Sequence, residues 1–237
     1  MLPAISVIIP AYNEAGRLGE TLRATIAYLD RESPGSELIV VDDGSNDETA
    51  EVARNIFAEQ HPVTTRLLEN ARNRGKGAAV RQGLLAASRE IALFSDADLS
   101  TPIEEMPKLV TPIAAGEVDV AFGSRALDRT LIGNRQPWRR EQAGRVFNLL
   151  ARTSTGLPFW DTQCGFKAFR MAACRPMVEA AKIDGFGFDV ELLLLAQRAG
   201  LKLRELPVRW NHHDGSKVHF VHDSLRMLRE VIALRFS

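Results

Sequence analysis

The sequence predicts an α/β protein built on a single, Rossmann-like, mainly parallel sheet flanked by helices. Short apolar runs alternate with segments of helical periodicity through the first half of the chain. The runs are continuous rather than alternating, which is typical of strands that helices cover on both faces. The loops richest in acidic and basic residues follow directly after predicted strands. Together these observations indicate an open sheet with its ligand site outside the carboxyl ends of the strands.

Five strands and four helices are expected in the first half of the chain. The strands are expected at residues 5–10, 37–42, 65–68, 90–95 and 118–123. The helices are expected at residues 15–30, 47–59, 77–88 and 102–115, with Pro102 suited to a first helical turn. After Arg125 the pattern is irregular, with helical stretches at residues 139–153, 171–181 and 190–199.

The composition excludes several classes of protein. The 237 residues are 45% hydrophobic, which is enough for one sizeable core. Lys and Arg total 30, as do Asp and Glu, so a formal net charge of zero gives no general attraction to nucleic acid. Two cysteines form neither a disulfide framework nor a zinc site. This cysteine usage predicts a reducing, cytoplasmic setting. No signal peptide and no uncharged apolar stretch of about 20 residues is visible, so we expect a protein that is soluble or rests on a membrane.

Two carboxylates stand at the end of the predicted strand at residues 90–95. A single residue, Ala97, separates Asp96 from Asp98, so both can meet one divalent cation. Oxygen ligands favour Mg²⁺ or Mn²⁺, and such an ion offsets the negative charge that develops on a departing diphosphate. Acidic residues in loops also cap helices and form turns, so a structural role for this common pattern is the alternative.

Another acidic pair follows the predicted strand at residues 37–42. Asp42 and Asp43 can direct a carboxylate at the N–H of a nucleotide base, while Gly44 permits close backbone approach. The alternative is a turn with a helix cap, with Asp47 at the start of the next helix.

A glycine-rich segment precedes the predicted helix at residues 77–88. Gly75 and Gly77 flank Lys76, which can lie near phosphate while the backbone amides approach it; a plain turn is the alternative. The segment lacks the spacing of a Walker A loop, and no Gly-x-Gly-x-x-Gly follows the first strand. These absences disfavour kinases, NTPases and dehydrogenases.

In this order, the loops resemble those of family 2 glycosyltransferases of the GT-A fold. The matching segments are SVIIPAYNE at 6–14, VVDDGS at 40–45, GKG at 75–77 and DAD at 96–98. Similarity to the polyprenyl (dolichyl) phosphate branch continues through DTQCGFK at 161–167, FDVEL at 188–192 and GSK at 215–217. Within that branch, the 161–169 and 188–192 segments look more like β-glucosyltransferases than the related mannosyl enzymes.

The resemblance implies an inverting transferase that moves glucose from UDP-glucose to a polyprenyl or dolichyl phosphate with Mg²⁺ or Mn²⁺. It implies one domain over residues 1–237, with a nucleotide-sugar-binding half at 1–125 and an acceptor-binding half at 126–237. The residues implied to hold the nucleotide sugar are Pro10, Ala11, Tyr12, Glu14, Asp42, Asp43, Gly75, Lys76, Asp96, Ala97 and Asp98. Those implied for the acceptor phosphate are Arg125, Arg139, Arg140, Ser216 and Lys217. The implied catalytic set is Asp98, Arg125, Arg140 and Lys217, with the metal on Asp96 and Asp98.

The nature of the acceptor decides whether the reaction needs a general base. A phosphate monoester does not, because its second pKa of about 6 leaves it mostly dianionic at neutral pH. A sugar hydroxyl does, and Asp161 and Asp189 are the candidates. Both residues are equally open to structural roles, as helix caps or partners of basic side chains.

Four alternative functions stay open at this point. GDP-mannose-dependent transfer to a polyprenyl phosphate and transfer to a soluble sugar hydroxyl both keep the family. A nucleotidyltransferase would need a phosphate-binding signature near the first strand, and residues 10–14 lack one. A module that binds a sugar nucleotide without turnover is disfavoured by the intact Asp96, Asp98 and Lys217.

The C-terminal segment at residues 220–236 is predicted to form an amphipathic helix. Its apolar side gathers Val221, Leu225, Leu228, Val231, Ile232 and Phe236. We therefore expect a lipid acceptor and a protein peripheral to the inner face of the membrane, with Lys217 where the lipid phosphate enters. Packing of this helix on the protein's own core is the alternative.

Overall fold

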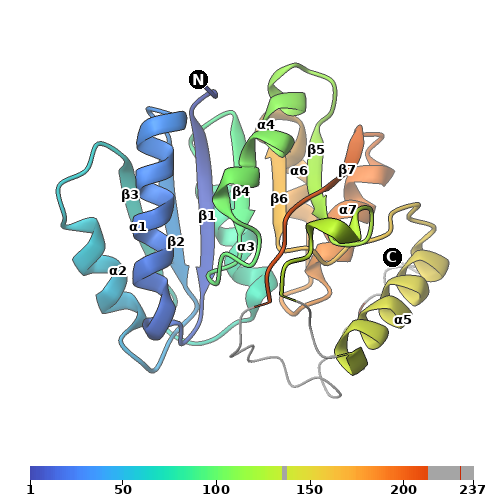
Figure 1. Cartoon of the computed structure of the whole chain (residues 1–237), viewed down its shortest axis with the longest axis horizontal. Helices are drawn as coiled ribbons and strands as arrows, with labels where there is room; N and C mark the ends of the chain where they lie inside the picture. The colour runs from blue at the N-terminus through green and yellow to red at the C-terminus, as the bar shows by residue number, and fades with distance from the viewer. Residues whose placement is uncertain (135–137, 213–229, 231–237) are drawn as a thin grey trace.

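A mixed sheet runs through the molecule, as the computed structural model shows (Figure 1). The structure describes residues 1–134, 138–212 and 230, and for residues 138–141 and 143–147 the backbone alone. Within this part of the chain the sheet has seven strands in the order β3-β2-β1-β4-β6-β5-β7. The strands are β1 (Ile5–Ala11), β2 (Glu37–Asp42), β3 (Thr64–Glu69), β4 (Ile91–Ser95), β5 (Val120–Ser124), β6 (Phe166–Arg170) and β7 (Leu203–Pro207). Neighbouring strands are parallel except at β6, which is antiparallel to both β4 and β5.

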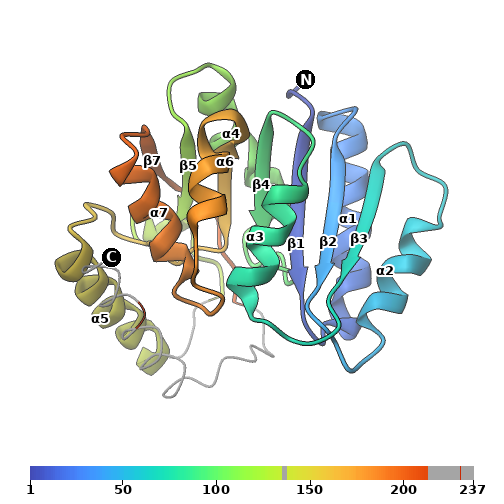
Figure 2. The ribbon, with the colours of Figure 1, turned by 180° about the vertical axis from the view of Figure 1, so that it is seen from behind.

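Helices cover both faces of the sheet (Figures 1 and 2). One face carries α1 (Ala15–Glu32), α2 (Thr49–Phe57) and α4 (Met106–Ala114), the last preceded by the 3₁₀ turn η1 (Ile103–Glu105). The other face carries α3 (Lys76–Ala86), α6 (Met171–Ala180) and α7 (Phe188–Arg198), as the reverse view shows. A second 3₁₀ turn, η2 (Arg129–Leu131), precedes α5 (Trp138–Thr155), which lies beyond the β7 end of the sheet in both views. The predicted fold class, a mainly parallel sheet flanked by helices, is confirmed.

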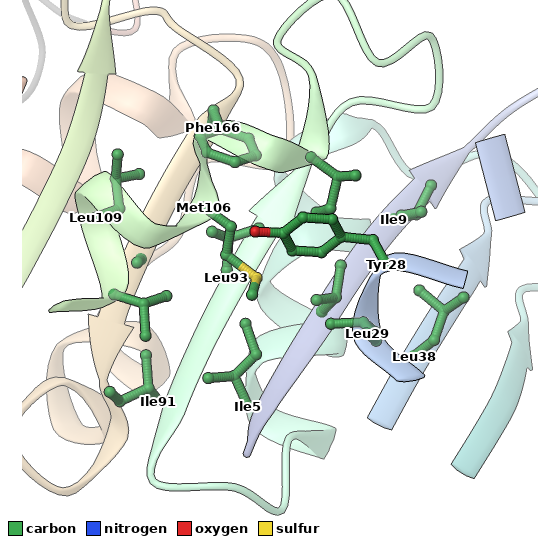
Figure 3. Packing of buried hydrophobic residues seen from close by; sticks show 14 of the residues in the cluster. Ile5, Ile9, Tyr28, Leu29, Leu38, Ile91, Leu93, Met106, Leu109 and Phe166 are labelled. Carbon is green, nitrogen blue, oxygen red and sulfur yellow. The ribbon is translucent and has the colours of Figure 1, made fainter. Parts of the chain in front are cut away.

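Each face of the sheet has its own apolar core. On the α1, α2 and α4 face, Tyr28 and Met106 pack among strand residues such as Ile9 and Leu93 (Figure 3). On the other face, Phe94 packs near Phe169 and Phe188, with ring centres 6.3 and 5.7 Å away. Full burial of each large apolar side chain contributes about 1.5–3 kcal/mol, so these two cores hold the helices in place.

Several predicted boundaries were wrong in instructive ways. The second helix begins at Thr49 rather than at residue 47, because Asp47 accepts the Thr49 N–H at 3.0 Å just ahead of the helix. The segment at 102–115 divides into η1 and α4, with Pro102 just ahead of both. Residues 64–69 alternate between exposed and half-buried positions, because β3 is an edge strand rather than one covered on both faces.

The strands β6 and β7 had no counterpart among the predicted elements. Lys167 interrupts the apolar run of β6, and β7 is half-buried along its whole length. The predicted helix at 220–236 lies outside the described residues apart from Glu230, whose carboxylate accepts the Gly187 N–H at 3.2 Å. Among the helices that the structure describes, none has the length and apolar character needed to span a membrane. The division into halves at residue 125 stays a prediction.

Gly83 shows how tightly α3 lies on the sheet. A Cβ at this position would come within 2.3 Å of the Ile8 Cγ2 atom and 3.2 Å of the Val41 Cγ2 atom. We expect Gly83→Ala to lower the free energy of unfolding by about 1–3 kcal/mol, because α3 must move away from β1 and β2. Urea denaturation followed by circular dichroism measures the change.

The control for this prediction is Gly16→Ala on α1, where nothing lies within 4 Å of the added Cβ. This substitution should leave the free energy of unfolding unchanged or raise it by up to about 1 kcal/mol. Equal effects of the two substitutions would contradict the close packing of α3.

Candidate active site

The predicted site residues converge at the carboxyl edge of the sheet, beside β1. The chain passes from β1 to β2 on one side, and β4 pairs with β1 on the other. Such a reversal of strand order leaves a crevice outside the strand ends, where ligands bind in α/β sheets. The loops after β1, β2 and β4 carry Glu14, Asp43 and Asp96, and all three meet at this edge (Figure 1).

The loops after β1 and β2 are joined by hydrogen bonds. Asn13, which has a positive φ of 53°, donates its N–H to the Ser45 hydroxyl at 2.8 Å. Its side-chain oxygen accepts the Asn46 N–H at 2.7 Å, and the Glu14 N–H donates to the Thr49 hydroxyl at 2.7 Å. Of the residues predicted to hold the nucleotide, Pro10 and Ala11 end β1, and Tyr12 and Glu14 are half-buried in this joined loop.

Asp43 organises the loop that leads to Lys76. Its buried carboxylate accepts hydrogen bonds from the Asn70 amide at 2.9 Å, the Arg74 N–H at 3.0 Å and the Gly75 N–H at 2.7 Å. Gly44 has a φ of +71°, and a Cβ there would fall 2.4 Å from the Arg72 carbonyl carbon. The close backbone approach predicted at Gly44 is therefore made by the chain itself, and the contact of this acidic pair with a nucleoside stays a prediction.

Asp42 has a similar internal partner. Its carboxylate accepts the hydroxyl and the N–H of Ser45, the latter at 3.3 Å. Both acids therefore hold loops at the edge of the site. This gives each of the two consecutive aspartates a structural role, whereas a turn with a helix cap did not explain why there are two.

Asp96 and Lys76 face each other at the centre of the site. The Lys76 Nζ atom lies 2.6 Å from Asp96 Oδ1, so the two side chains form an ion pair. Burial alone would lower the pKa of Lys76, but the Asp96 and Asp189 carboxylates outweigh it and raise that pKa. Lys76 is therefore a permanent cation at the point where the sequence predicts phosphate.

The donor atoms at Asp96 and Asp98 fit a hard divalent cation. The Asp96 side chain is 33% exposed beside Lys76, and Asp98 is half-buried, with its Oδ1 atom oriented by the Ser100 N–H at 2.9 Å. Among the described residues, no group of three or more His, Cys, Asp or Glu side chains could hold a metal. Mg²⁺ is commonly held by one or two carboxylates together with substrate phosphates, so two carboxylates suit a metal that arrives with a diphosphate.

Arg17 belongs to this charge cluster, and the sequence reasoning missed it. Its guanidinium makes an ion pair with Glu14, with one N–O distance of 2.9 Å. The hydrogen bond to Glu14, followed by the charges of Asp98 and Asp96, raises the pKa of Arg17 despite partial burial. The sequence signal was the spacing of three residues between Glu14 and Arg17, which places their side chains next to each other at the start of α1.

Arg125 and Asp161 form a second charged unit, at the end of β5. The guanidinium donates to both carboxylate oxygens, at 2.7 and 2.8 Å, and the Arg125 N–H donates at 3.0 Å. Glu205 holds the same segment by accepting the Asp161 N–H at 2.7 Å. Burial opposes ionisation of Asp161, but Arg125 outweighs it and lowers the pKa of that carboxyl. A lowered pKa and a bidentate partner are the reverse of what a general base for a hydroxyl needs.

Asp189, the other candidate base, pairs with Lys167 in the core. Lys167 has no exposed surface, and its ammonium donates to the Asp189 carboxylate and to the Cys164 carbonyl, the latter at 2.6 Å. Burial raises the pKa of Asp189, although Lys167 and Lys76 partly offset it. Burial also raises the pKa of the Cys164 thiol to about 12, so the thiol is unreactive at neutral pH. Cys164 contributes to this cluster through its main-chain carbonyl, which accepts the Lys167 ammonium.

The remaining acceptor candidates cannot be placed beside Arg125. Arg139 and Arg140 lie in α5, but their side chains are outside the described residues, as are Ser216 and Lys217. Their assignment to the acceptor phosphate stays a prediction.

The fold and the charged edge of the sheet agree with the class expected from the sequence, a GT-A transferase. The sequence model of glycosyl transferase family 2 matches residues 6–178. The chain is 34% identical over 256 residues to the dolichyl-phosphate β-glucosyltransferase of Saccharomyces cerevisiae, and the match covers 98% of this chain and 74% of that one. It is 31% identical over 242 residues to the Homo sapiens protein of the same name, with the same coverage. The chain therefore belongs to glycosyltransferase family 2, and it is a glycosyltransferase.

Solved structures agree with this fold. Glucosyl-3-phosphoglycerate synthase from Mycobacterium tuberculosis, in complex with Mn²⁺, UDP and phosphoglyceric acid, has a TM-score of 0.65 and 25% identity. The match covers 97% of this chain and 76% of that one. A divalent metal is thus a feature of a structural neighbour, in line with the donor atoms at Asp96 and Asp98.

The Arg125–Asp161 pair makes a stability prediction with a defined pH dependence. The pKa of Asp161 is lower in the folded than in the unfolded protein, so the pair contributes fully above the unfolded value of about 3.9, and this contribution is lost as pH falls through the folded value. We expect Asp161→Ala to lower the free energy of unfolding at pH 7 by about 3 kcal/mol. The substitution leaves the Arg125 guanidinium, whose side chain is only 28% exposed, without its carboxylate partner. Urea denaturation at a series of pH values measures this.

The control for Asp161→Ala is Glu117→Ala, which removes the exposed pair with Arg204. Loss of this pair should cost at most about 1 kcal/mol. The difference between parent and Asp161→Ala should shrink below about pH 4. A constant difference at all pH values would contradict the assigned ion pair.

Proposed function

We propose that this protein transfers glucose from UDP-glucose to a dolichyl or related polyprenyl phosphate, with inversion at the anomeric carbon and a Mg²⁺ or Mn²⁺ requirement. The observation that carries the proposal is the match over 97–98% of the chain to proteins named dolichyl-phosphate β-glucosyltransferase in yeast, Drosophila melanogaster and human. This agreement favours glucose over mannose, and lipid phosphate over a soluble hydroxyl. Neither a nucleotidyltransferase nor a binding module is favoured by these relatives.

On the donor side, the charge cluster suits a diphosphate leaving group. Asp96 and Asp98 would hold the metal, which when bound supplies Lewis-acid stabilisation of the departing UDP. Lys76 adds a fixed cation on the same side, and Arg17 adds another beside Glu14. Preorganised cations at the point where negative charge develops lower the barrier without rearrangement.

On the acceptor side, the two candidate bases support a phosphate nucleophile. Asp161 is held by Arg125 and Asp189 by Lys167, and each carboxylate is almost fully buried. A dianionic phosphate attacks without losing a proton, so the reaction proceeds with both acids engaged in ion pairs. Arg125 retains an exposed portion of its guanidinium and lies 5.7 Å from the centre of the Trp210 ring, where it can meet the acceptor phosphate.

We further propose that the protein is peripheral to the inner face of the membrane, and an exposed apolar group near the acceptor side supports contact with a bilayer surface. Trp160 is 57% exposed, and Leu149 of α5 is 59% exposed, with Leu150 next to it. The Arg152 guanidinium lies 4.1 Å from the centre of the Trp160 ring. Aromatic rings and arginine stems of this kind are favoured at a bilayer surface. The Thr162 hydroxyl donates to the Asn148 side chain at 3.0 Å, which joins α5 to the segment that carries Asp161.

Donor binding is tested with Asp98→Ala and two nucleotides. We expect the parent protein to bind UDP more tightly than GDP in the presence of Mn²⁺, and Asp98→Ala to lose most of this binding, because the diphosphate would lack its metal. Isothermal calorimetry measures both affinities, and thermal melting shows that the variant is folded. A folded Asp98→Ala protein with normal turnover, or a preference for GDP, would overturn the donor assignment.

The acceptor is tested with liposomes that contain dolichyl phosphate. We expect UDP release from UDP-glucose only with these liposomes, and reduced flotation of the double variant Leu149→Ser/Trp160→Ser, which removes apolar surface. Liposomes without dolichyl phosphate are the control for turnover. Glucose transfer to a soluble sugar hydroxyl, with no response to the lipid phosphate, would overturn the acceptor assignment.

A further inference from the structure

Lys167 carries a charge where the fold would favour an apolar side chain. It lies on β6 opposite Phe94 of β4, and its ammonium is 5.4 Å from the centre of the Phe94 ring. Its exposed fraction is 0%, and that of the Asp189 side chain is 6%. Removing two charges from water is costly, and apolar residues of similar size often serve stability equally well or better. The presence of this pair therefore points to a requirement for geometry.

The ammonium joins two segments that are distant in the sequence. It donates to Asp189 on the first turn of α7 and to the carbonyl of Cys164, which lies in the turn before β6. One side chain thereby fixes the start of α7 relative to that turn.

The turn before β6 directly supports the Asp96 carboxylate. The Gly165 carbonyl accepts the Asp96 N–H at 3.1 Å. The Gly165 Cα is so close that a Cβ on it would fall 2.0 Å from Asp96 Oδ2. Any shift of residues 164–165 therefore moves the carboxylate predicted to bind the metal.

The start of α7 supports Lys76 in the same way. The Phe188 ring centre lies 5.9 Å from the Lys76 Nζ atom, and a Cβ on Gly77 would fall 2.7 Å from the Phe188 Cβ. The Gly77 N–H donates to the Asp184 carbonyl at 2.8 Å, in the loop before α7. Of the two segments that Lys167 joins, the turn before β6 therefore contacts Asp96, and the start of α7 contacts Lys76.

We propose that the Lys167–Asp189 pair positions the donor site by fixing the places of Asp96 and Lys76, the carboxylate and the cation that would meet a metal-bound diphosphate. The inference rests on the proposed function of Asp96 and Lys76 in donor binding. Lys167 and Asp189 are positioning residues, because they touch Cys164 and each other. Groups of this kind behind a metal ligand commonly change metal affinity when they are replaced.

The test is the double variant Lys167→Met/Asp189→Val. Lys167→Met alone leaves a buried carboxylate without its partner and is expected to destabilise the fold, whereas removal of the whole pair leaves an apolar contact. We expect the double variant to melt at or above the temperature of the parent. We also expect its Mn²⁺-dependent affinity for UDP to fall roughly 10- to 100-fold, as calorimetry would measure. The KM for UDP-glucose should rise with it, while kcat changes less.

The matched control is Arg170→Met on the same strand. Arg170 lies at the other end of β6, paired in register with Ile91, and its guanidinium binds the carbonyls of Ile113 and Val118. This variant should melt at a lower temperature but bind UDP as the parent does.

Three outcomes would count against the positioning role. A double variant that binds Mn²⁺ and UDP like the parent would overturn the positioning role and leave the proposed function intact. A double variant that does not fold would assign the pair to the fold alone and overturn the role as well. A parent protein that binds no UDP would overturn the proposed function, and the positioning role with it.

Discussion

The site depends on the antiparallel insertion of β6 between β4 and β5. Because β6 runs against its neighbours, it begins at the edge where β4 ends, and the turn before it meets Asp96. A parallel strand in this place would bring its last residues to the same edge and a different loop with them. The insertion also carries Lys167 into the core, beneath the loops that bear Asp96 and Lys76. The edge predicted to bind the metal is therefore held in place by the second half of the chain.

The acids at this edge divide into two groups by their surroundings. Asp43, Asp161 and Asp189 have partners from the protein, so their charges are used to hold loops and cations in place. Asp96 pairs with Lys76 but keeps part of its surface exposed, and Asp98 is half-buried. Carboxylates with exposed oxygen surface can still bind a divalent cation, so the two groups differ in what they can still bind.

The sequence predicted the parallel half of the fold well, because each strand there is an apolar run and each helix has clear periodicity. It did not predict β6 or β7, since Lys167 breaks one pattern and half-burial blurs the other. At the site, the loops after β2 and β4 were found because acids gathered after apolar runs. Pairings such as Arg125 with Asp161, 36 residues apart, were beyond reach, because nothing local in the sequence specifies a tertiary ion pair. Arg17 was missed although a local spacing rule applied to it.

The manner in which residues 70–75 are held has a consequence for how much sequence change this loop tolerates. Asp43 grips this loop largely through the main-chain N–H groups of Arg74 and Gly75. The side chains at 71–74 are exposed, so they take little part in setting its course. Because the loop is held through its backbone, its path does not depend on which side chains it carries. Substitutions at these four positions should therefore leave the backbone of the loop in place.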